Sequence, residues 1–217
     1  ANAAPFDAVR YFLAKPSADG ASRYTVIKDF RKGADKIKES DRNILHRYMT
    51  LTKCDLFFAD KAIPIEGPTE RLLMPRIFQL IDEALDDSKR LSLQYVSTVE
   101  VDGANAKIFS PLLDFLELRT LVITDLDAVK MGDKGRYVKC PYSQGERSLN
   151  TTLRDWFDMK DGEALTLELL KAKTPEEKVK GYRRVAYQVH EAGSNFCART
   201  YEDAFILANP TLFGLKE

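Results

Sequence analysis

Four acidic residues follow apolar stretches of this chain with a spacing that suits a metal-binding site. Glu66 ends one apolar run, and Glu70 follows it four residues later, after a Gly-Pro turn. Asp125 and Asp127 end a second apolar run and lie two residues apart, so their side chains leave an extended chain on the same face. Carboxylates that converge repel one another unless a cation neutralises them, and Mg²⁺ and Mn²⁺ prefer oxygen ligands. The spacing therefore predicts a divalent-metal site.

A purely structural role is the competing interpretation of these acids. Glu66 and Glu70 would complement the dipole of the helix that follows them, and Asp125 and Asp127 would be loop residues. Each residue taken alone fits that interpretation better. The repetition of a buried-strand pattern that ends in acids favours the metal site for the four together.

The elements that must position these acids alternate between strand and helix patterns. Apolar runs at 62–65, 91–101 and 119–124 predict three strands, and amphipathic segments at about 68–85 and 104–117 predict the intervening helices. This order predicts a parallel sheet with right-handed crossovers. Ligands of such folds bind outside the carboxyl ends of the strands, where the four acids fall. The first helix is expected to turn six apolar residues inward: Leu72, Leu73, Ile77, Leu80, Ile81 and Leu85.

Further elements are expected on both sides of this alternation. Residues 34–51 have the pattern of a surface helix, and the polar segment 128–149 predicts a long loop. Thr200 and Asp203 have the spacing of a helix-opening capping box. The remaining predicted elements are helices near 151–157 and 163–173 and a fourth strand at 184–190.

We therefore expect an α/β fold with a mainly parallel sheet of four strands or slightly more, flanked by helices, with an additional helical insertion after the third strand. Residues 1–52 are expected to form an N-terminal extension or connector with a helix. Residues 53–217 are expected to form the catalytic domain, with the helical insertion at about 145–180.

Composition and charge say little about partners. The 217 residues are 44% hydrophobic, which is ample for a buried core, and 33 basic residues balance 33 acidic ones. Cys54, Cys140 and Cys197 are odd in number and widely spaced, which indicates reduced thiols in an intracellular protein. No apolar run approaches the roughly 18 residues of a membrane span, so a membrane is not an expected partner.

The basic segment after the aspartate pair is the best local candidate for contact with a phosphate backbone. A solvated lysine-rich loop is the alternative, and the position directly after the acids makes the two interpretations about equal. The candidate residues, which are interleaved with two tyrosines, are Lys130, Lys134, Arg136, Lys139 and Arg147.

The acids and their flanking motifs resemble a known family. Ile65-Glu66-Gly67 with Glu70, and the strand that runs into Asp125-Leu126-Asp127, resemble the Toprim domain of topoisomerases, primases and certain nucleases. Phe57-Phe58-Ala59-Asp60-Lys61 and Arg199-Thr200-Tyr201-Glu202-Asp203-Ala204-Phe205 are more specifically similar to the OLD (overcoming lysogenisation defect) nuclease family.

This resemblance covers about residues 42–210 and implies a Toprim-like fold. It also implies an endonuclease that hydrolyses phosphodiester bonds of DNA. Each site would use two divalent ions, Mg²⁺ or Mn²⁺. Ser148 is similar to the serine of a family serine-asparagine segment, although Leu149 separates it from the asparagine. For Glu202, a helix-opening acid is the competing interpretation. The metal-binding acids that the resemblance implies are Glu66, Glu70, Asp125, Asp127 and Glu202.

The resemblance also implies partners beyond DNA. These are an N-terminal ABC-type ATPase half of the full-length protein and a helicase, in a cytoplasmic, bacterial or phage-encoded protein of phage defence. ATP would act only through the ATPase half, because this chain has no Gly-x-x-x-x-Gly-Lys-Ser/Thr loop. The family places a lysine beyond its last motif, for which Lys216, Lys130 and Lys139 are the candidates.

Two other functions remain open at this point. A topoisomerase or primase relative would use the same sheet and acids. A catalytically inert regulatory or dimerisation module would keep the fold for partner binding alone.

Overall fold

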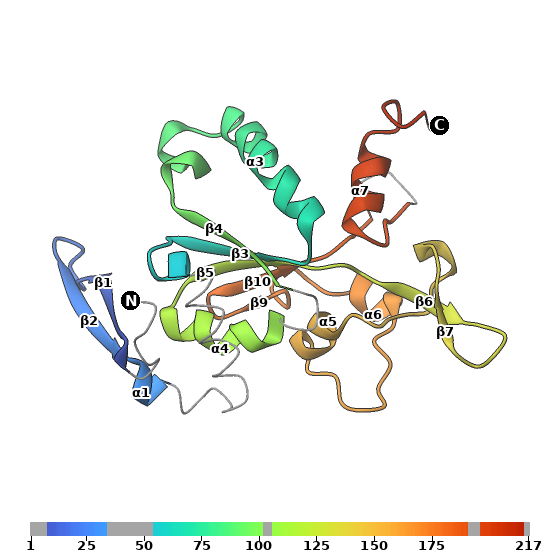
Figure 1. Ribbon diagram of the computed structural model, residues 1–217, viewed down its shortest axis with the longest axis horizontal. Coiled ribbons are helices and arrows are strands. Elements are labelled where there is room, and N and C mark those ends of the chain that lie inside the picture. Colours follow the sequence, from blue (N-terminus) through green and yellow to red (C-terminus); the bar gives the residue numbers. More distant parts are fainter. Residues whose placement is uncertain (1–7, 34–53, 102–105, 191–195, 215–217) are drawn as a thin grey trace.

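A five-stranded sheet forms the centre of the fold in a computed structural model that describes residues 8–33, 54–101, 106–190 and 196–214 (Figure 1). The strand order is β4-β3-β5-β10-β9. β3 pairs in parallel with β4 and β5, β10 is parallel to β5, and β9 is antiparallel at the edge. The predicted mainly parallel sheet is confirmed. The strands are β3 (Lys61–Ile65), β4 (Val96–Glu100), β5 (Arg119–Ile123), β9 (Val179–Lys180) and β10 (Arg183–Ala186).

The two central strands part at their carboxyl ends. β3 pairs with β4 along its whole length, but it pairs with β5 only at Lys61 and Ala62. Pro64 lies beyond that pairing, and it has no N–H to contribute to a ladder. The separation opens space at the edge of the sheet where Glu66 and Asp125 follow their strands.

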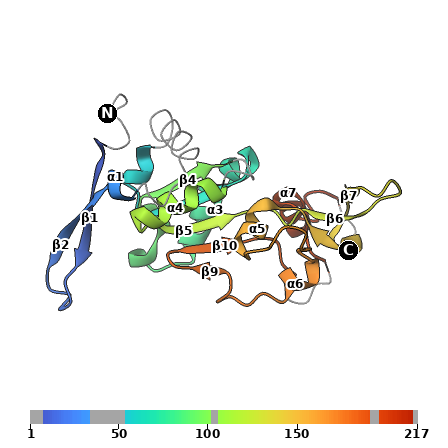
Figure 2. The ribbon, with the colours of Figure 1, turned by 90° about the horizontal axis from the view of Figure 1, so that it is seen from below.

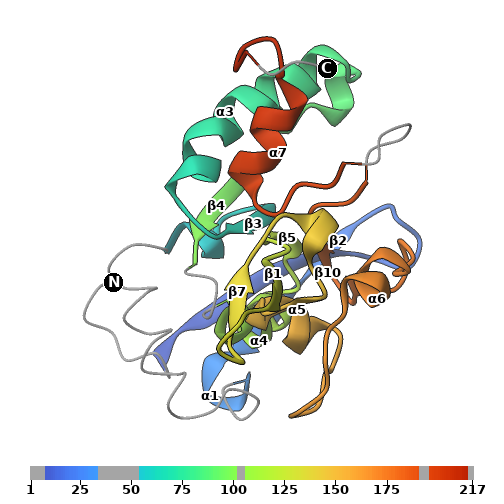
Figure 3. The same cartoon turned by 90° about the vertical axis from the view of Figure 1, so that its right-hand side faces the viewer.

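Helices cover both faces of the sheet. α4 (Ala106–Leu116) packs the main core on one face, where Phe109, Leu112 and Leu116 are fully buried. α3 (Pro68–Glu83) lies on the opposite face together with α7 (Tyr201–Ala208), and these two helices are neighbours (Figures 1 and 3).

The inward face of α3 differs from the predicted one. Leu72, Leu80 and Ile81 are exposed, and Leu73, Ile77 and Leu85 are only half-buried, whereas Met74 is buried. Two acids explain this rotation of the helix. Glu70 is buried, and the buried carboxylate of Asp82 accepts hydrogen bonds from the backbone N–H groups of Leu91 (2.6 Å) and Ser92 (2.9 Å). A carboxylate anchored in this way fixes which side of the helix faces inward.

The same hydrogen bonds shorten the strand predicted at 91–101. Leu91–Leu93 form a 3-10 helix, η5, which follows another short one, η4 (Asp87–Lys89), and β4 begins only at Val96. The helix predicted at 34–51 lies outside the described residues.

The prediction of a long loop at 128–149 is wrong. This segment forms a three-stranded antiparallel sheet of order β7-β6-β8, which extends beyond the end of β5 (Figure 1). Residues paired across the strands share a side, so Ala128 and Ser148 are buried on one side and Val129 is buried on the other, and Gly135 supplies the turn between β6 and β7 with a φ of 67°. Exposed Val138 and Lys139 leave neither side uniformly apolar, which obscured the strand pattern. The strands are β6 (Ala128–Met131), β7 (Tyr137–Lys139) and β8 (Arg147–Ser148), with a 3-10 turn, η6 (Tyr142–Gln144), between the last two.

Short helices follow this small sheet, as predicted. α5 (Thr151–Trp156) and α6 (Leu167–Lys171) pack around Leu126, Leu153 and Leu165 in a second core. The segment after the third strand is therefore part sheet and part helix. No helix among the described residues is both long and apolar enough to cross a membrane.

An N-terminal hairpin lies at the other end of the molecule from the small sheet (Figure 2). It consists of β1 (Arg10–Pro16) and β2 (Arg23–Asp29) and leads into a single helical turn, α1 (Phe30–Gly33). Phe30 packs in the main core, to which the 3-10 helix η3 (Cys54–Phe57) also contributes Leu56. The domain boundary between residues 52 and 53 stays a prediction.

An ion-pair cluster also joins the hairpin to the domain. The Nζ atoms of Lys15 and Lys28 lie 2.7 and 2.8 Å from the carboxylate of Glu117, which follows α4. Burial opposes the charge of this carboxylate, but the two ammonium groups prevail and lower its pKa.

We expect Glu117→Gln to lower the free energy of unfolding by about 1 kcal/mol at pH 7. Because the pKa is lower in the folded state, the carboxylate contributes stability above its unfolded pKa of about 4.3 and loses it as the pH falls further. Urea denaturation at several pH values would therefore show that the difference in free energy of unfolding between the unaltered protein and Glu117→Gln becomes smaller in acid. Glu83→Gln is the control, since the Glu83–Arg76 pair is exposed and 3.9 Å apart, and no effect is expected there.

Candidate functional site

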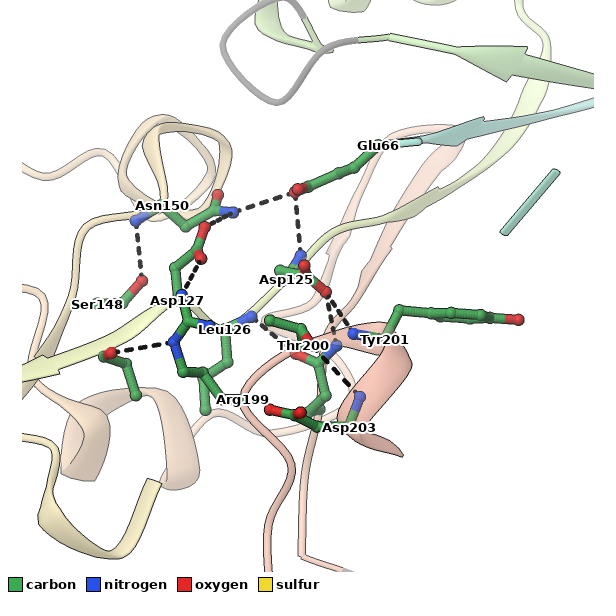
Figure 4. Close-up of polar contacts among 12 residues, drawn as sticks. Glu66, Asp125, Leu126, Asp127, Ser148, Asn150, Arg199, Thr200, Tyr201 and Asp203 are labelled. Atoms are coloured by element: carbon green, nitrogen blue, oxygen red, sulfur yellow. Dashed lines mark hydrogen bonds and ion pairs between the residues drawn. The ribbon is translucent and has the colours of Figure 1, made fainter. Parts of the chain in front are cut away.

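Glu66 connects the separated ends of β3 and β5. Its Oε1 accepts hydrogen bonds from the backbone N–H of Asp125 (3.0 Å) and from Nδ2 of Asn150 (3.1 Å) (Figure 4). It also accepts a hydrogen bond from the hydroxyl of Thr124. The predicted convergence of Glu66 and Asp125 at one edge is thus present in the structure.

Asp125 is held by the end of β10 and the start of α7. Its Oδ1 accepts hydrogen bonds from Nε2 of Gln188 (2.9 Å) and from the backbone N–H of Tyr201 (2.8 Å). Gln188 also accepts a hydrogen bond from the N–H of Leu126 (2.7 Å). From the described residues, no donor reaches Oδ2 of Asp125 or Oε2 of Glu66, so one oxygen of each carboxylate is available for a ligand.

Asp127 is paired with a cation. Nη2 of Arg199 lies 3.1 Å from its Oδ1, and Nδ2 of Asn150 lies 3.4 Å from its Oδ2. Arg199 also donates to the carbonyl of Ala128 (3.3 Å). The backbone of Asp127 has a φ of 49°, a conformation that is uncommon outside glycine and is often found at functional sites.

Glu70 and Glu202 approach the same edge from α3 and α7. Glu70 is buried, and burial raises its pKa, with the negative charges of Glu202 and Glu66 adding to the effect. Hydrogen bonds that the carboxylate of Glu202 accepts from its own backbone N–H and from the Thr69 hydroxyl lower its pKa. Thr200 caps α7 by accepting from the N–H of Asp203 (3.3 Å), which confirms the predicted helix start and places Glu202 in the first turn.

Negative charge accumulates where Asp125 lies. Burial raises the pKa of Asp125 to about 7, and the nearby carboxylates of Glu66 and Asp127 contribute, while the hydrogen bond from Gln188 acts in the opposite direction. A carboxylate shifted in this way is typical of functional sites. The cluster is therefore short of positive charge.

The donor chemistry fits Mg²⁺ or Mn²⁺, since carboxylate oxygens are the ligands that these ions prefer. The side chains are not arranged as a finished cage: within the described ranges, no three His, Cys, Asp or Glu side chains are grouped so that they could hold a metal ion. Binding would need the carboxylates to rotate toward a shared ion. The assignment of all five acids as ligands stays a prediction.

Ser148 and Asn150 have different positions relative to the carboxylates. Ser148 is fully buried, and its Oγ accepts a hydrogen bond from the N–H of Asn150 (3.0 Å). Asn150 is the residue that contacts Glu66 and Asp127, and its Oδ1 caps α5 by accepting from the N–H of Leu153 (2.9 Å). Ser148 thus orients Asn150 and contacts neither carboxylate.

Asn150, Gln188 and Arg199 were not among the predicted site residues. An asparagine before the short helix pattern at 151–157 signals a helix cap, and this signal was available for Asn150. Arg199 opens the 199–205 motif of the family resemblance, which was a signal for it. Gln188 had no local signal, because its contacts depend on tertiary structure.

The predicted nucleic-acid residues lie on the small sheet next to Asp127. Lys134, Arg136 and Lys139 are exposed. Lys130 donates to Oε1 of Gln144 (2.6 Å), and the guanidinium of Arg147 stacks over the ring of Tyr137 at 4.4 Å. Among the candidates for the downstream lysine, Lys130 and Lys139 are on this sheet, and Lys216 lies outside the described residues.

Comparisons with known proteins point to one family. Residues 57–127 match the family model described as "Overcoming lysogenization defect protein-like, TOPRIM domain". The chain is also 29% identical over 188 residues to "Endonuclease GajA" of Bacillus cereus (strain HuB5-5), and this alignment covers 85% of the chain and 24% of the relative. The chain thus spans about a quarter of the length of that relative. Residues 57–127, with the site's acids Glu66, Glu70, Asp125 and Asp127, therefore form an OLD-like Toprim domain.

Proposed function

We propose that this chain is the nuclease part of a DNA-cleaving protein and hydrolyses phosphodiester bonds with divalent metal ions. The observation that carries the proposal is the junction of Glu66 with the backbone of Asp125, which brings two carboxylates with available oxygens to one edge of the sheet. The Toprim match and the endonuclease relative support the same reaction.

The residues divide by role. Glu66 and Asp125 would hold the ions most directly, with Glu70, Asp127 and Glu202 completing the ligand set. Bound Mg²⁺ or Mn²⁺, two ions in the proposed mechanism, would supply an activated water and neutralise charge on the phosphate. Asn150 and Gln188 are positioning residues, since they orient Glu66 and Asp125. Arg199 balances the charge of Asp127.

We infer that DNA passes along β6, β7 and the turn between them on its way to the carboxylates, because the exposed Lys134, Arg136 and Lys139 lie there. The salt dependence of DNA binding tests this, because each phosphate contact contributes about 0.9 to the slope of log K against log salt. Lys134→Gln with Arg136→Gln and Lys139→Gln is expected to reduce the slope by about 2 to 3. Fluorescence anisotropy of a labelled DNA duplex, with EDTA present and at several salt concentrations, measures the affinity and therefore the slope.

The matched control removes three charges elsewhere. Lys32→Gln, Lys160→Gln and Arg184→Gln together keep the same net charge as the triple variant of the small sheet, since each loses three cations. An equal change of slope in both variants would show that only overall charge matters, and DNA would then not pass along β6 and β7.

The experiment for the reaction itself uses supercoiled plasmid. The full-length protein and this chain are each incubated with plasmid and Mg²⁺ or Mn²⁺, and nicked or linear products are expected, with loss of product in EDTA. No cleavage by either protein would contradict the nuclease function. A covalent DNA–tyrosine adduct would indicate a strand-passing relative, and primer synthesis would indicate a primase.

The wider setting rests on the resemblance alone. The ABC-type ATPase half, the helicase partner, a cytoplasmic location and a role in phage defence remain predictions for the full-length protein. Comparing the plasmid reaction of the full-length protein with and without ATP would show whether the ATPase half controls cleavage.

A further inference from the structure

A second cleft lies at the amino ends of the strands, away from the carboxylates. Its volume is about 600 Å³, and its walls come from the β1–β2 hairpin, the starts of β3 and β5, and Tyr182. Lys61 begins β3, whereas Glu66 follows the same strand five residues later, roughly 16 Å along an extended chain. The cleft is therefore separate from the carboxylate site.

The cations of this cleft are mostly unpaired. Lys15, Arg23, Lys61 and Arg119 line it, and of these Lys15 is paired with Glu117. In the part of the chain that the structure describes, the side chains of Arg23, Lys61 and Arg119 make neither a hydrogen bond nor an ion pair. Three positive groups thus face one space without internal partners.

The acids of the cleft are already engaged. Glu117 is paired with Lys15 and Lys28 and accepts a hydrogen bond from the hydroxyl of Tyr182 (3.3 Å). Asp60 accepts from the backbone N–H of Tyr95 (2.8 Å). Four cations and two acids line the cleft, although the whole chain is neutral, so an excess of positive charge is concentrated here.

We propose that this cleft binds phosphate groups. Two guanidinium groups and one ammonium suit a phosphate, because arginine presents paired N–H donors that match phosphate oxygens. The half-exposed ring of Tyr182 beside them offers a stacking surface for a nucleic-acid base. The phosphates would come either from a nucleic-acid backbone or from a small free phosphate compound. The proposal does not depend on the nuclease function.

Calorimetric titration in EDTA at low salt tests this binding without metal at the carboxylates. Inorganic pyrophosphate and a short single-stranded oligonucleotide are the probes. The cleft variant combines Arg23→Gln, Lys61→Gln and Arg119→Gln, and the control combines Lys32→Gln, Lys160→Gln and Arg184→Gln. We expect the cleft variant to bind at least about tenfold more weakly than the control.

The two probes distinguish the sources of phosphate. If the cleft variant loses binding of both probes, a free phosphate compound is sufficient as a ligand of the cleft. If it loses binding of the oligonucleotide alone, the ligand is a nucleic-acid backbone. Arg23→Gln alone, on the exposed hairpin, should weaken binding to a smaller extent and serves if the triple variant does not fold. Equal affinities of the cleft variant and the control, or no binding of either probe to the unaltered protein, would overturn the proposal.

Discussion

Asp125→Asn is expected to lower the rate of metal-dependent DNA cleavage by more than about 100-fold. Loss of a residue that only orients a metal ligand typically costs about 10- to 100-fold, and loss of a ligand itself should cost more. The fold should persist. The Oδ1 atom of asparagine can still accept the hydrogen bonds that Gln188 and the backbone of Tyr201 donate to Asp125. Only the negative charge of the Asp125 carboxylate is lost, so the initial rate of plasmid nicking measures how much that charge contributes to cleavage.

The same substitution should stabilise the metal-free protein at pH 8. Asp125 has a pKa of about 7 in the folded state, above the unfolded value of about 3.9, so its contribution to stability is greatest in acid and is lost as the pH rises through 7. Above pH 7 the folded protein must hold Asp125 as a charged carboxylate, which is unfavourable at this site, and asparagine carries no charge. We therefore expect the free energy of unfolding to rise by an amount on the order of 1 to 3 kcal/mol at pH 8. Asp161→Asn, at an exposed position, is the control and should change neither stability nor cleavage. A destabilised Asp125→Asn protein with full cleavage would contradict both expectations.

Asn150→Ala is expected to reduce both stability and cleavage. Asn150 caps α5 and donates to Glu66, so the change removes a cap worth about 1 kcal/mol and leaves a half-buried carboxylate oxygen with fewer donors. The free energy of unfolding should fall by about 2 to 4 kcal/mol. Cleavage should fall by about 10- to 100-fold, because Glu66 is no longer oriented. Urea denaturation and the nicking rate measure the two effects.

Serine at the same position separates the two roles. Asn150→Ser retains a good capping residue but is too short to reach Glu66, so cleavage should fall while more of the stability is kept. Thr166→Ala removes the cap of α6, away from the carboxylates, and should cost about 1 kcal/mol without a change in cleavage. Full activity of Asn150→Ser would show that Asn150 is only a helix cap.

The central sheet and its acids could be predicted because they depend on local patterns. Glu66 and Asp125 each end a buried strand, and in a parallel sheet the carboxyl ends of strands share one edge, so their convergence follows from the strand order. The residues that hold them could not be predicted in this way. Gln188 reaches Asp125 from the segment that follows β10, and its contact exists only after the sheet has formed.

The errors of prediction also have physical causes. Apolar spacing placed Leu72 and Leu80 inside, but the hydrogen bonds of Asp82 decide the rotation of α3, and a pattern of apolar residues does not include buried acids. Residues 128–149 appeared to be a loop because their strands are short and both sides of the sheet mix polar and apolar residues. The stacking of Arg147 on Tyr137 joins residues ten positions apart and has no short-range signal.

The central claim is that Glu66 and Asp125 form a divalent-metal site, and calorimetric titration of Mn²⁺ into the unaltered protein and Glu66→Gln tests it most directly. Glutamine keeps the Oε1 atom that accepts hydrogen bonds from Thr124, Asp125 and Asn150, so the edge of the sheet should stay intact. The account predicts Mn²⁺ binding by the unaltered protein and an affinity at least about tenfold lower in Glu66→Gln. Equal affinity of the two proteins, or no binding of Mn²⁺ by the unaltered protein, would contradict it.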